Sequence, residues 1–208
     1  MLKYKKTQNR GYMRFFKENF DNIIKLFINQ IGISIFALFL YTAAGAVEIA
    51  DPEKAMMIKV LISVFSIIFY FFLIYNICWE IGAKDKIKID GNRLERRPSK
   101  GIFLGLYANL LNFAFVGLAF GLFLIYMLSG VEAFKSIFAV MNLIFRLFMS
   151  IYLGAIQGIF SFMPDGDTLF LLETLGYILF SGVSALVIYA SYLLGLSEKK
   201  LIGSVKKK

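Results

Sequence analysis

The chain contains no histidine, and this absence excludes several kinds of chemistry. Serine hydrolases of the Ser–His type need a histidine as general base, and zinc-dependent membrane proteases need histidine ligands. The single cysteine, Cys78, excludes a disulfide framework. Walker-type phosphate loops and the G-x-G-x-x-G fingerprint are also missing, so the chain hydrolyses no nucleotide by itself. We therefore expect no metal and no cofactor, and the balance is against an enzyme.

Charged residues are scarce as well, at 18% of the 208 residues, against about 25% in soluble domains. Hydrophobic residues reach 59%, which is more apolar surface than one soluble core of this length could bury. This composition excludes intrinsic disorder. It predicts an all-α, polytopic membrane protein, with residues 1–208 forming a single integral membrane domain.

Charged residues divide the chain into five uncharged runs, whose lengths predict the membrane spans. A helix needs about 20 apolar residues to cross a hydrocarbon core of about 30 Å. Four runs reach that length, and the run 147–164 is marginal. The three prolines fall at run edges, where they mark turns between helices. The five runs are 26–47, 60–79, 101–131, 147–164 and 174–197.

The distribution of basic residues predicts which ends of the spans face the cytoplasm. Residues 1–25 carry seven basic and two acidic side chains, and the segment 80–100 carries seven basic and four acidic ones. The intervening loop 48–59 is slightly acidic. We therefore expect the N-terminus and the segment 80–100 to be cytoplasmic and the loop 48–59 to be outside.

The last part of the chain decides between an even and an odd number of spans. The tail 198–208 has five lysines and one glutamate, whereas Asp165, Asp167 and Glu173 form an acidic stretch before it. Five plain crossings would place this stretch inside and the basic tail outside, against the charge rule. We favour four spans plus a segment, 133–163, that enters and leaves from the outer side as a re-entrant or interfacial helix. Both termini are then cytoplasmic, and five transmembrane helices are the alternative.

The segment 133–163 carries polar and small residues at steps of three or four, which places them on one helical face. This face either packs against neighbouring helices or lines a polar pathway. Arg146 sharpens the question, because a charge in mid-membrane costs at least about 2.5–3.5 kcal/mol and needs a partner. Glu173, at the start of the last run, is one candidate partner, and Glu132 is another.

Two amides mark the third run. Asn109 and Asn112 lie three residues apart on one apolar helix. Such a pair usually forms hydrogen bonds between helices and less often contacts a ligand. The candidate residues for packing or substrate binding are therefore Asn109, Asn112, Asn142, Arg146, Gln157 and Glu173.

Small residues predict close helix contacts. Three G-x-x-x-G pairs allow two backbones to approach closely, within a tight bundle or in a homo-oligomer. These pairs are Gly101/Gly105, Gly117/Gly121 and Gly154/Gly158.

The basic segments predict contact with the membrane surface and not with nucleic acid. Residues 12–31 have the pattern of an amphipathic helix that can lie in the headgroup layer before entering the first span. The stretch 86–97 alternates around an Asp-Gly-Asn turn, which favours a small β-hairpin or a solvated loop. Each charge near the surface attracts anionic lipid headgroups by about 1 kcal/mol. The candidate residues for this contact are Arg93, Arg96, Arg97 and Lys100.

The leading functional interpretation is a small, non-enzymatic integral protein of the bacterial cytoplasmic membrane, either a membrane-embedded subunit or a transporter-like helical bundle. The bacterial source is an expectation from the Phe-, Ile-, Lys- and Asn-rich composition. One alternative is an enzyme acting on a lipid headgroup through Arg146, Glu173 and the outer acidic loop. Another is a structural or assembly factor without a solute. The expected partners are the bilayer, its anionic headgroups, and either another membrane protein or a second copy of the chain.

Overall fold

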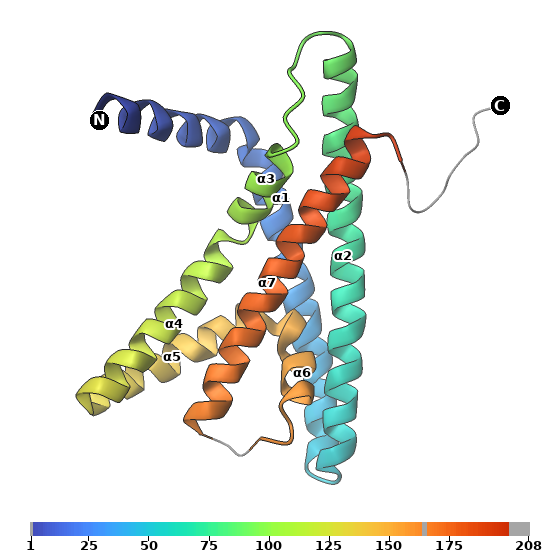
Figure 1. Cartoon of the computed structure of the whole chain (residues 1–208). Coiled ribbons are helices and arrows are strands. Elements are labelled where there is room, and N and C mark those ends of the chain that lie inside the picture. Colours follow the sequence, from blue (N-terminus) through green and yellow to red (C-terminus); the bar gives the residue numbers. More distant parts are fainter. Residues whose placement is uncertain (1, 164–165, 200–208) are drawn as a thin grey trace, which may run out of the picture.

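A computed structural model describes residues 2–163 and 166–199, and every regular element in this part of the chain is a helix (Figure 1). Four helical segments are long and apolar enough to cross a membrane, namely Phe15–Glu48, Pro52–Asp90, Leu110–Ser129 and Thr168–Leu196. A fifth is added if two helices that meet at a sharp bend count as one span. The all-α, multi-pass prediction is confirmed at this level.

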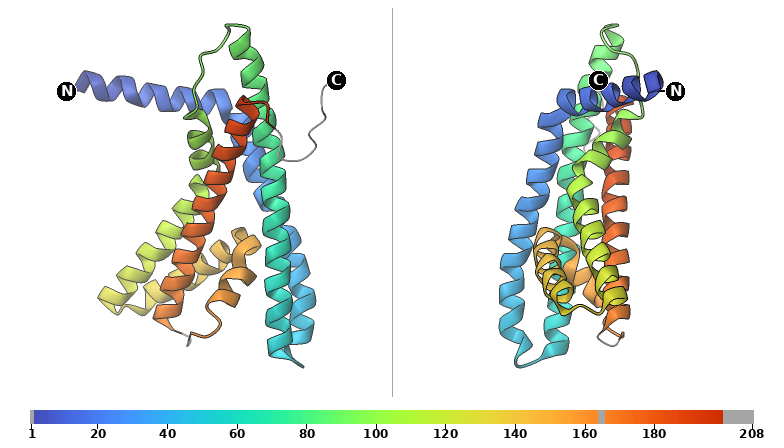
Figure 2. Two further views of the ribbon diagram at one scale, coloured as in Figure 1. Left: turned by 45° about the vertical axis from the view of Figure 1, so that its right-hand side comes forward. Right: turned by 90° about the vertical axis from the view of Figure 1, so that its left-hand side faces the viewer.

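Helix α1 (Leu2–Glu48) is a single helix of 47 residues. At 1.5 Å per residue it is about 70 Å long, more than twice the thickness of a bilayer core. Its first part lies across one end of the bundle, and the rest runs along the bundle (Figure 2). The predicted helix over residues 12–31, continuing into the first span, is therefore confirmed.

Helix α2 (Pro52–Asp90) begins after a turn of three residues, because Asp51 caps it and Pro52 occupies the first turn. The Asp51 carboxylate accepts a hydrogen bond from the Lys54 backbone N–H at 3.0 Å. The helix runs to Asp90, and residues 91–97 form turns and irregular backbone in exposed positions. Of the two alternatives for 86–97 the β-hairpin is therefore wrong, and the solvated loop fits residues 91–97 alone. Ion pairs four residues apart, Glu80–Lys84 and Lys86–Asp90, stabilise the helical form of this charged stretch.

The third uncharged run forms two helices, α3 (Lys100–Ala108) and α4 (Leu110–Ser129), which meet at Asn109. The Asn109 side chain donates a hydrogen bond to the Gly105 carbonyl at 3.0 Å. Asparagine competes in this way with the backbone for helical hydrogen bonds. Helix α4 ends at Gly130, whose φ of 65° is the left-handed conformation that glycine adopts readily.

Helices α5 (Glu132–Phe148) and α6 (Ser150–Ile159) meet at Met149 with a bend of 106°. The prediction that 133–163 presents its polar residues on one continuous helical face is therefore wrong. The bend lies inside the bundle, and both outer ends of the pair point to the end of the molecule that holds the α1–α2 turn (Figure 1). Helix α7 (Asp167–Leu196) then runs the length of the bundle.

The two ends of the bundle differ in charge. One end holds the first part of α1, the end of α2, the segment 91–99 and the end of α7 (Figures 1 and 2). We call it the basic end, because Lys84, Lys88, Arg93, Arg96 and Arg97 lie there in exposed positions. The far end holds the α1–α2 turn and the start of α7.

The bundle is apolar outside and partly polar inside. Large apolar side chains such as Phe39, Leu61 and Leu186 are 64–73% exposed, as expected of surfaces that face lipid. Gln30 and Asn112, in contrast, are only 2% exposed. Polar groups in the interior of a membrane bundle need partners inside the protein. Their arrangement therefore defines the candidate site.

Candidate functional site

One face of α7 is polar along most of its length and is buried. Glu173, Tyr177, Ser181, Ser184 and Tyr192 follow one another at helical spacing, and each is at most 5% exposed. We call these five residues the polar column. On the same face, only the buried Ile188 separates Ser184 from Tyr192.

The far end of the polar column is an ion pair. The Arg146 guanidinium on α5 lies 2.5 Å from the Glu173 carboxylate. The Glu173 side chain is 6% exposed, and that of Arg146 is 35% exposed. The Arg146 Nε–H is buried without a partner among the described residues. The structure therefore brings together the two candidate residues with opposite charge, as expected from the sequence.

The middle of the column contacts three amides from other helices, Gln30, Asn109 and Asn112, which we call the amide cluster. Gln30 and Asn112 exchange two hydrogen bonds, of 2.8 and 3.0 Å. Asn112 also donates to Asn109 at 3.0 Å. The Tyr70 hydroxyl lies 3.4 Å from both Gln30 and Ser184, and Asn109 lies 3.5 Å from Ser184. The cluster thus joins α1, α2, α4 and α7 at the Asn109 break.

Replacing Asn112 by leucine should destabilise the bundle by about 1–3 kcal/mol, because both ends of the Gln30 amide lose a buried partner. Thermal unfolding of the purified protein in detergent measures the effect. Asn142→Leu is the matched control, since Asn142 is half-buried and forms no hydrogen bond within the described part of the chain. Equal losses from the two substitutions would contradict the role given to the cluster.

The bend between α5 and α6 is held by side chains of α1 and α2. The Ser34 hydroxyl donates to the Phe148 carbonyl at 2.8 Å, and the Ser63 hydroxyl donates to the Ile151 carbonyl at 2.5 Å. Ser150 donates to the Ser34 carbonyl at 2.7 Å. A helix break frees backbone groups that must be satisfied inside a membrane protein. These serines provide that compensation, so the bend is built into the packing.

Four hydroxyls, two in the polar column and two beside it, have no hydrogen-bond partner among the described residues. They are buried, and they come from α2, α6 and α7. A buried hydroxyl without a partner costs about 1–3 kcal/mol. The residues are Ser66, Tyr152, Tyr177 and Ser181.

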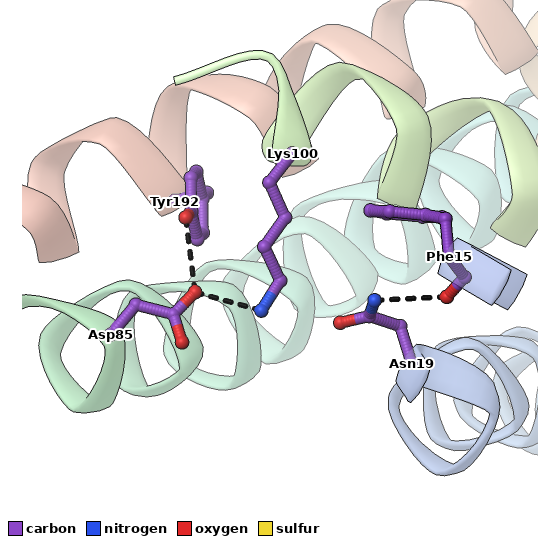
Figure 3. Close-up of polar contacts among 5 residues, drawn as sticks. All are labelled: Phe15, Asn19, Asp85, Lys100 and Tyr192. Carbon is purple, nitrogen blue, oxygen red and sulfur yellow. Dashed lines mark hydrogen bonds and ion pairs between the residues drawn. The ribbon is translucent and has the colours of Figure 1, made fainter. Parts of the chain in front are cut away.

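At the basic end, Tyr192 joins the column to a second ion pair (Figure 3). The Asp85 carboxylate on α2 accepts hydrogen bonds from the Lys100 ammonium at 2.7 Å and from the Tyr192 hydroxyl at 3.0 Å. Asn19 on α1 donates to the Phe15 carbonyl at 3.0 Å, and its carboxamide oxygen points toward Lys100. Asp85 is 4% exposed, although it belongs to the basic segment 80–100 that the sequence assigned to the cytoplasmic side of the spans.

Sequence reasoning missed Asp85 and Tyr192. The usable signal was the helical spacing of Ile74, Cys78, Ile81 and Asp85, all of which are buried on one face of α2. The uncharged-run criterion ended the span at Trp79 and so treated every later residue as loop.

The remaining candidates lie apart from these contacts. Gln157 and Asn142 are half-buried and form no hydrogen bond within the described residues. Arg93, Arg96 and Arg97 are exposed, and Arg97 pairs with Glu95 at 3.1 Å. Lys100, grouped with these arginines from the sequence, is instead drawn into the Asp85 pair.

Metal ligation finds no support in the geometry. Among the described side chains, no three His, Cys, Asp or Glu residues gather closely enough to hold a metal ion. The acidic residue Asp165 lies outside the described residues, and the Asp167 side chain is likewise not described.

Comparisons with known proteins give no family for this chain. No protein-family model matches it, and neither a curated protein nor a solved structure is significantly similar to it. Its function is therefore inferred from its own residues.

Proposed function

We propose that the chain is a non-enzymatic protein of the bacterial cytoplasmic membrane that acts as a small carrier, alone or as the membrane-embedded subunit of a larger complex. The polar column is its pathway for a small polar or lipid-like solute. The observation that carries this proposal is the column itself, which is buried and has an ion pair at each end. Ionisable residues within a membrane bundle mark substrate or ion pathways by default.

The unpartnered hydroxyls strengthen this reading. A face used only for helix packing would gain stability from apolar side chains at Ser66, Tyr152, Tyr177 and Ser181. A passing solute or a file of water molecules, in contrast, needs such groups as temporary partners. Ile188, on the same face, separates these hydroxyls from the Asp85 pair and would act as the apolar barrier between them.

The proposed topology puts the basic end in the cytoplasm and makes α5–α6 a re-entrant pair from the outer side. Basic residues favour the cytoplasmic side of spans. Both outer ends of the α5–α6 pair lie at the far end of the bundle, which supports entry and exit on one side. Helices broken in mid-bundle, here at Asn109 and Met149, are also typical of transporter binding sites.

A structural or assembly role is the second candidate, because one observation favours it. The amides of Gln30 and Asn112 exchange two hydrogen bonds with each other, as expected of a seam closed by packing. The lipid-enzyme alternative draws less support, since Arg146 meets one carboxylate, that of Glu173, in the described residues.

Cysteine accessibility separates the carrier from the structural role. Starting from a Cys78→Ala chain, single cysteines are placed in the column at Ser181 and Ser184, and on the outer surface at Leu179 and Leu186. The outer pair is 63% and 64% exposed and serves as the lipid-facing control. A charged thiol reagent reacts with the thiolate, which needs water.

We expect modification in native membranes at Ser181→Cys and Ser184→Cys, and none at Leu179→Cys or Leu186→Cys. Four unreactive positions would mean that the column is closed, and the structural role would replace the carrier. Reaction at all four positions would show that water, and not lipid, contacts the outer surface, and it would contradict the membrane topology.

A further inference from the structure

A cavity of about 160 Å³ opens at the basic end, between the first part of α1 and the end of α2. It is smaller than pockets that enclose whole ligands, at about 300–1,000 Å³. Its size therefore suits one polar group of a larger molecule. Its polar wall includes Asn19, Asn22, Lys25, Lys84, Lys88 and Lys100.

The charges around this cavity leave a positive excess. Four lysines and three acidic residues line it. Lys84 pairs with Glu80 at 2.6 Å, and Lys100 pairs with Asp85 at 2.7 Å. Lys25 and Lys88 form no ion pair with a described residue. A ligand with a single negative charge would balance the lining.

The depth of the cavity in the membrane follows from its apolar residues. Ile77 and Ile81 line it beside the lysines, at the point where the uncharged run 60–79 ends. An apolar run of this length ends where the hydrocarbon core meets the headgroups. The first part of α1 crosses the bundle at the same end, in the orientation of a helix lying in the headgroup layer (Figure 2).

We propose that this cavity is a specific site for the phosphodiester headgroup of an anionic lipid. Lys25 and Lys88 face the phosphate oxygens, and the amides of Asn19 and Asn22 offer hydrogen bonds to the hydroxyls of the headgroup. Ile77 and Ile81 pack against the start of the acyl chains. Basic pockets between membrane helices on the cytoplasmic side bind anionic headgroups in this manner. The site shares Asp85 and Lys100 with the ion pair at the basic end of the polar column, but lipid binding there does not depend on transport along the column.

The test measures binding of three probes to the purified full chain in a neutral detergent. The probes are short-chain phosphatidylglycerol, phosphatidylcholine with the same acyl chains, and inorganic phosphate. The cavity variant carries Lys25→Gln and Lys88→Gln. The matched control carries Arg93→Gln and Arg96→Gln, which removes the same charge from exposed positions at the same end.

We expect phosphatidylglycerol to bind more tightly than phosphatidylcholine and to lose at least about tenfold in affinity in the cavity variant, since each lysine contributes about fivefold. The arginine variant should lose less than about threefold, because Arg93 and Arg96 do not line the cavity and act on the bound headgroup only through screening solvent. Lys25→Arg with Lys88→Arg should retain binding. Equal losses of affinity in the two glutamine variants would show that binding depends on general surface charge and not on this cavity. Binding of inorganic phosphate with the same dependence on Lys25 and Lys88 would identify a free anion as the ligand. Either result overturns the proposal.

Discussion

Arg146→Ala is expected to lower the free energy of unfolding by about 2 kcal/mol, since it leaves the buried Glu173 carboxylate without a compensating charge. The stranded group is Glu173, whose side chain is 6% exposed and faces the interior beside Tyr177. Abundance in the membrane fraction and thermal unfolding in detergent measure the loss.

A double variant tests whether the loss of stability comes from the stranded Glu173 carboxylate or from the missing Arg146 side chain. Arg146→Leu with Glu173→Leu removes both charges, and replacing a buried pair by apolar residues is often neutral or stabilising. It should therefore be more stable than Arg146→Ala. If the double variant were as unstable as the single one, lost packing and not the stranded carboxylate would be the cause.

Gly82→Ala should be strongly disruptive for the addition of a single methyl group, destabilising the bundle by about 3 kcal/mol. A Cβ atom at Gly82 would lie 2.3 Å from the Tyr192 carbonyl oxygen and 2.9 Å from the Leu196 backbone nitrogen. These are backbone atoms of α7, so no side-chain rotation relieves the clash. Gly195 faces the crossing from the other side, with the Trp79 carbonyl 2.2 Å from its Cβ position.

The single tryptophan reports on this crossing. The Trp79 indole donates to the Lys199 carbonyl at 2.7 Å, so its fluorescence should shift to longer wavelength when α2 and α7 separate in Gly82→Ala. Gly182→Ala is the control, because a Cβ there meets nothing within 4 Å. That substitution should be neutral or stabilising by up to about 1 kcal/mol. An unchanged melting temperature in Gly82→Ala would contradict the close approach.

The spans were predictable because they depend on one local quantity, the length of the uncharged run. Helix ends that lie beyond an uncharged run could not be predicted in this way. The extension of α2 to Asp90 relies on ion pairs four residues apart and on a buried Asp85, which the charge count assigned to a loop. Charge alone does not distinguish a solvated residue from one paired inside the bundle.

The two helix breaks were missed for a different reason. The hydrogen bonds that replace the lost helical ones come from distant parts of the sequence, as with Ser34 and the Phe148 carbonyl. The close glycine contacts also depend on partners that are distant in the sequence. Gly105 and Gly154 meet neighbouring backbones, whereas Gly117 meets nothing within 4 Å, although all three belong to the same motif. Only the three-dimensional partner decides which copy of the motif is used.

The contact between Gly82 and Gly195 also limits how the bundle can move. Helices α2 and α7 touch backbone to backbone near the basic end, and α6 lies between them toward the far end (Figure 1). A contact that leaves no room for a side chain fixes the distance between the two helices at that point. Helix α7 can therefore rotate about the contact but cannot slide along α2. Displacing α6 would therefore separate α2 from α7 first at the far end, while the glycine contact holds the two helices together near the basic end.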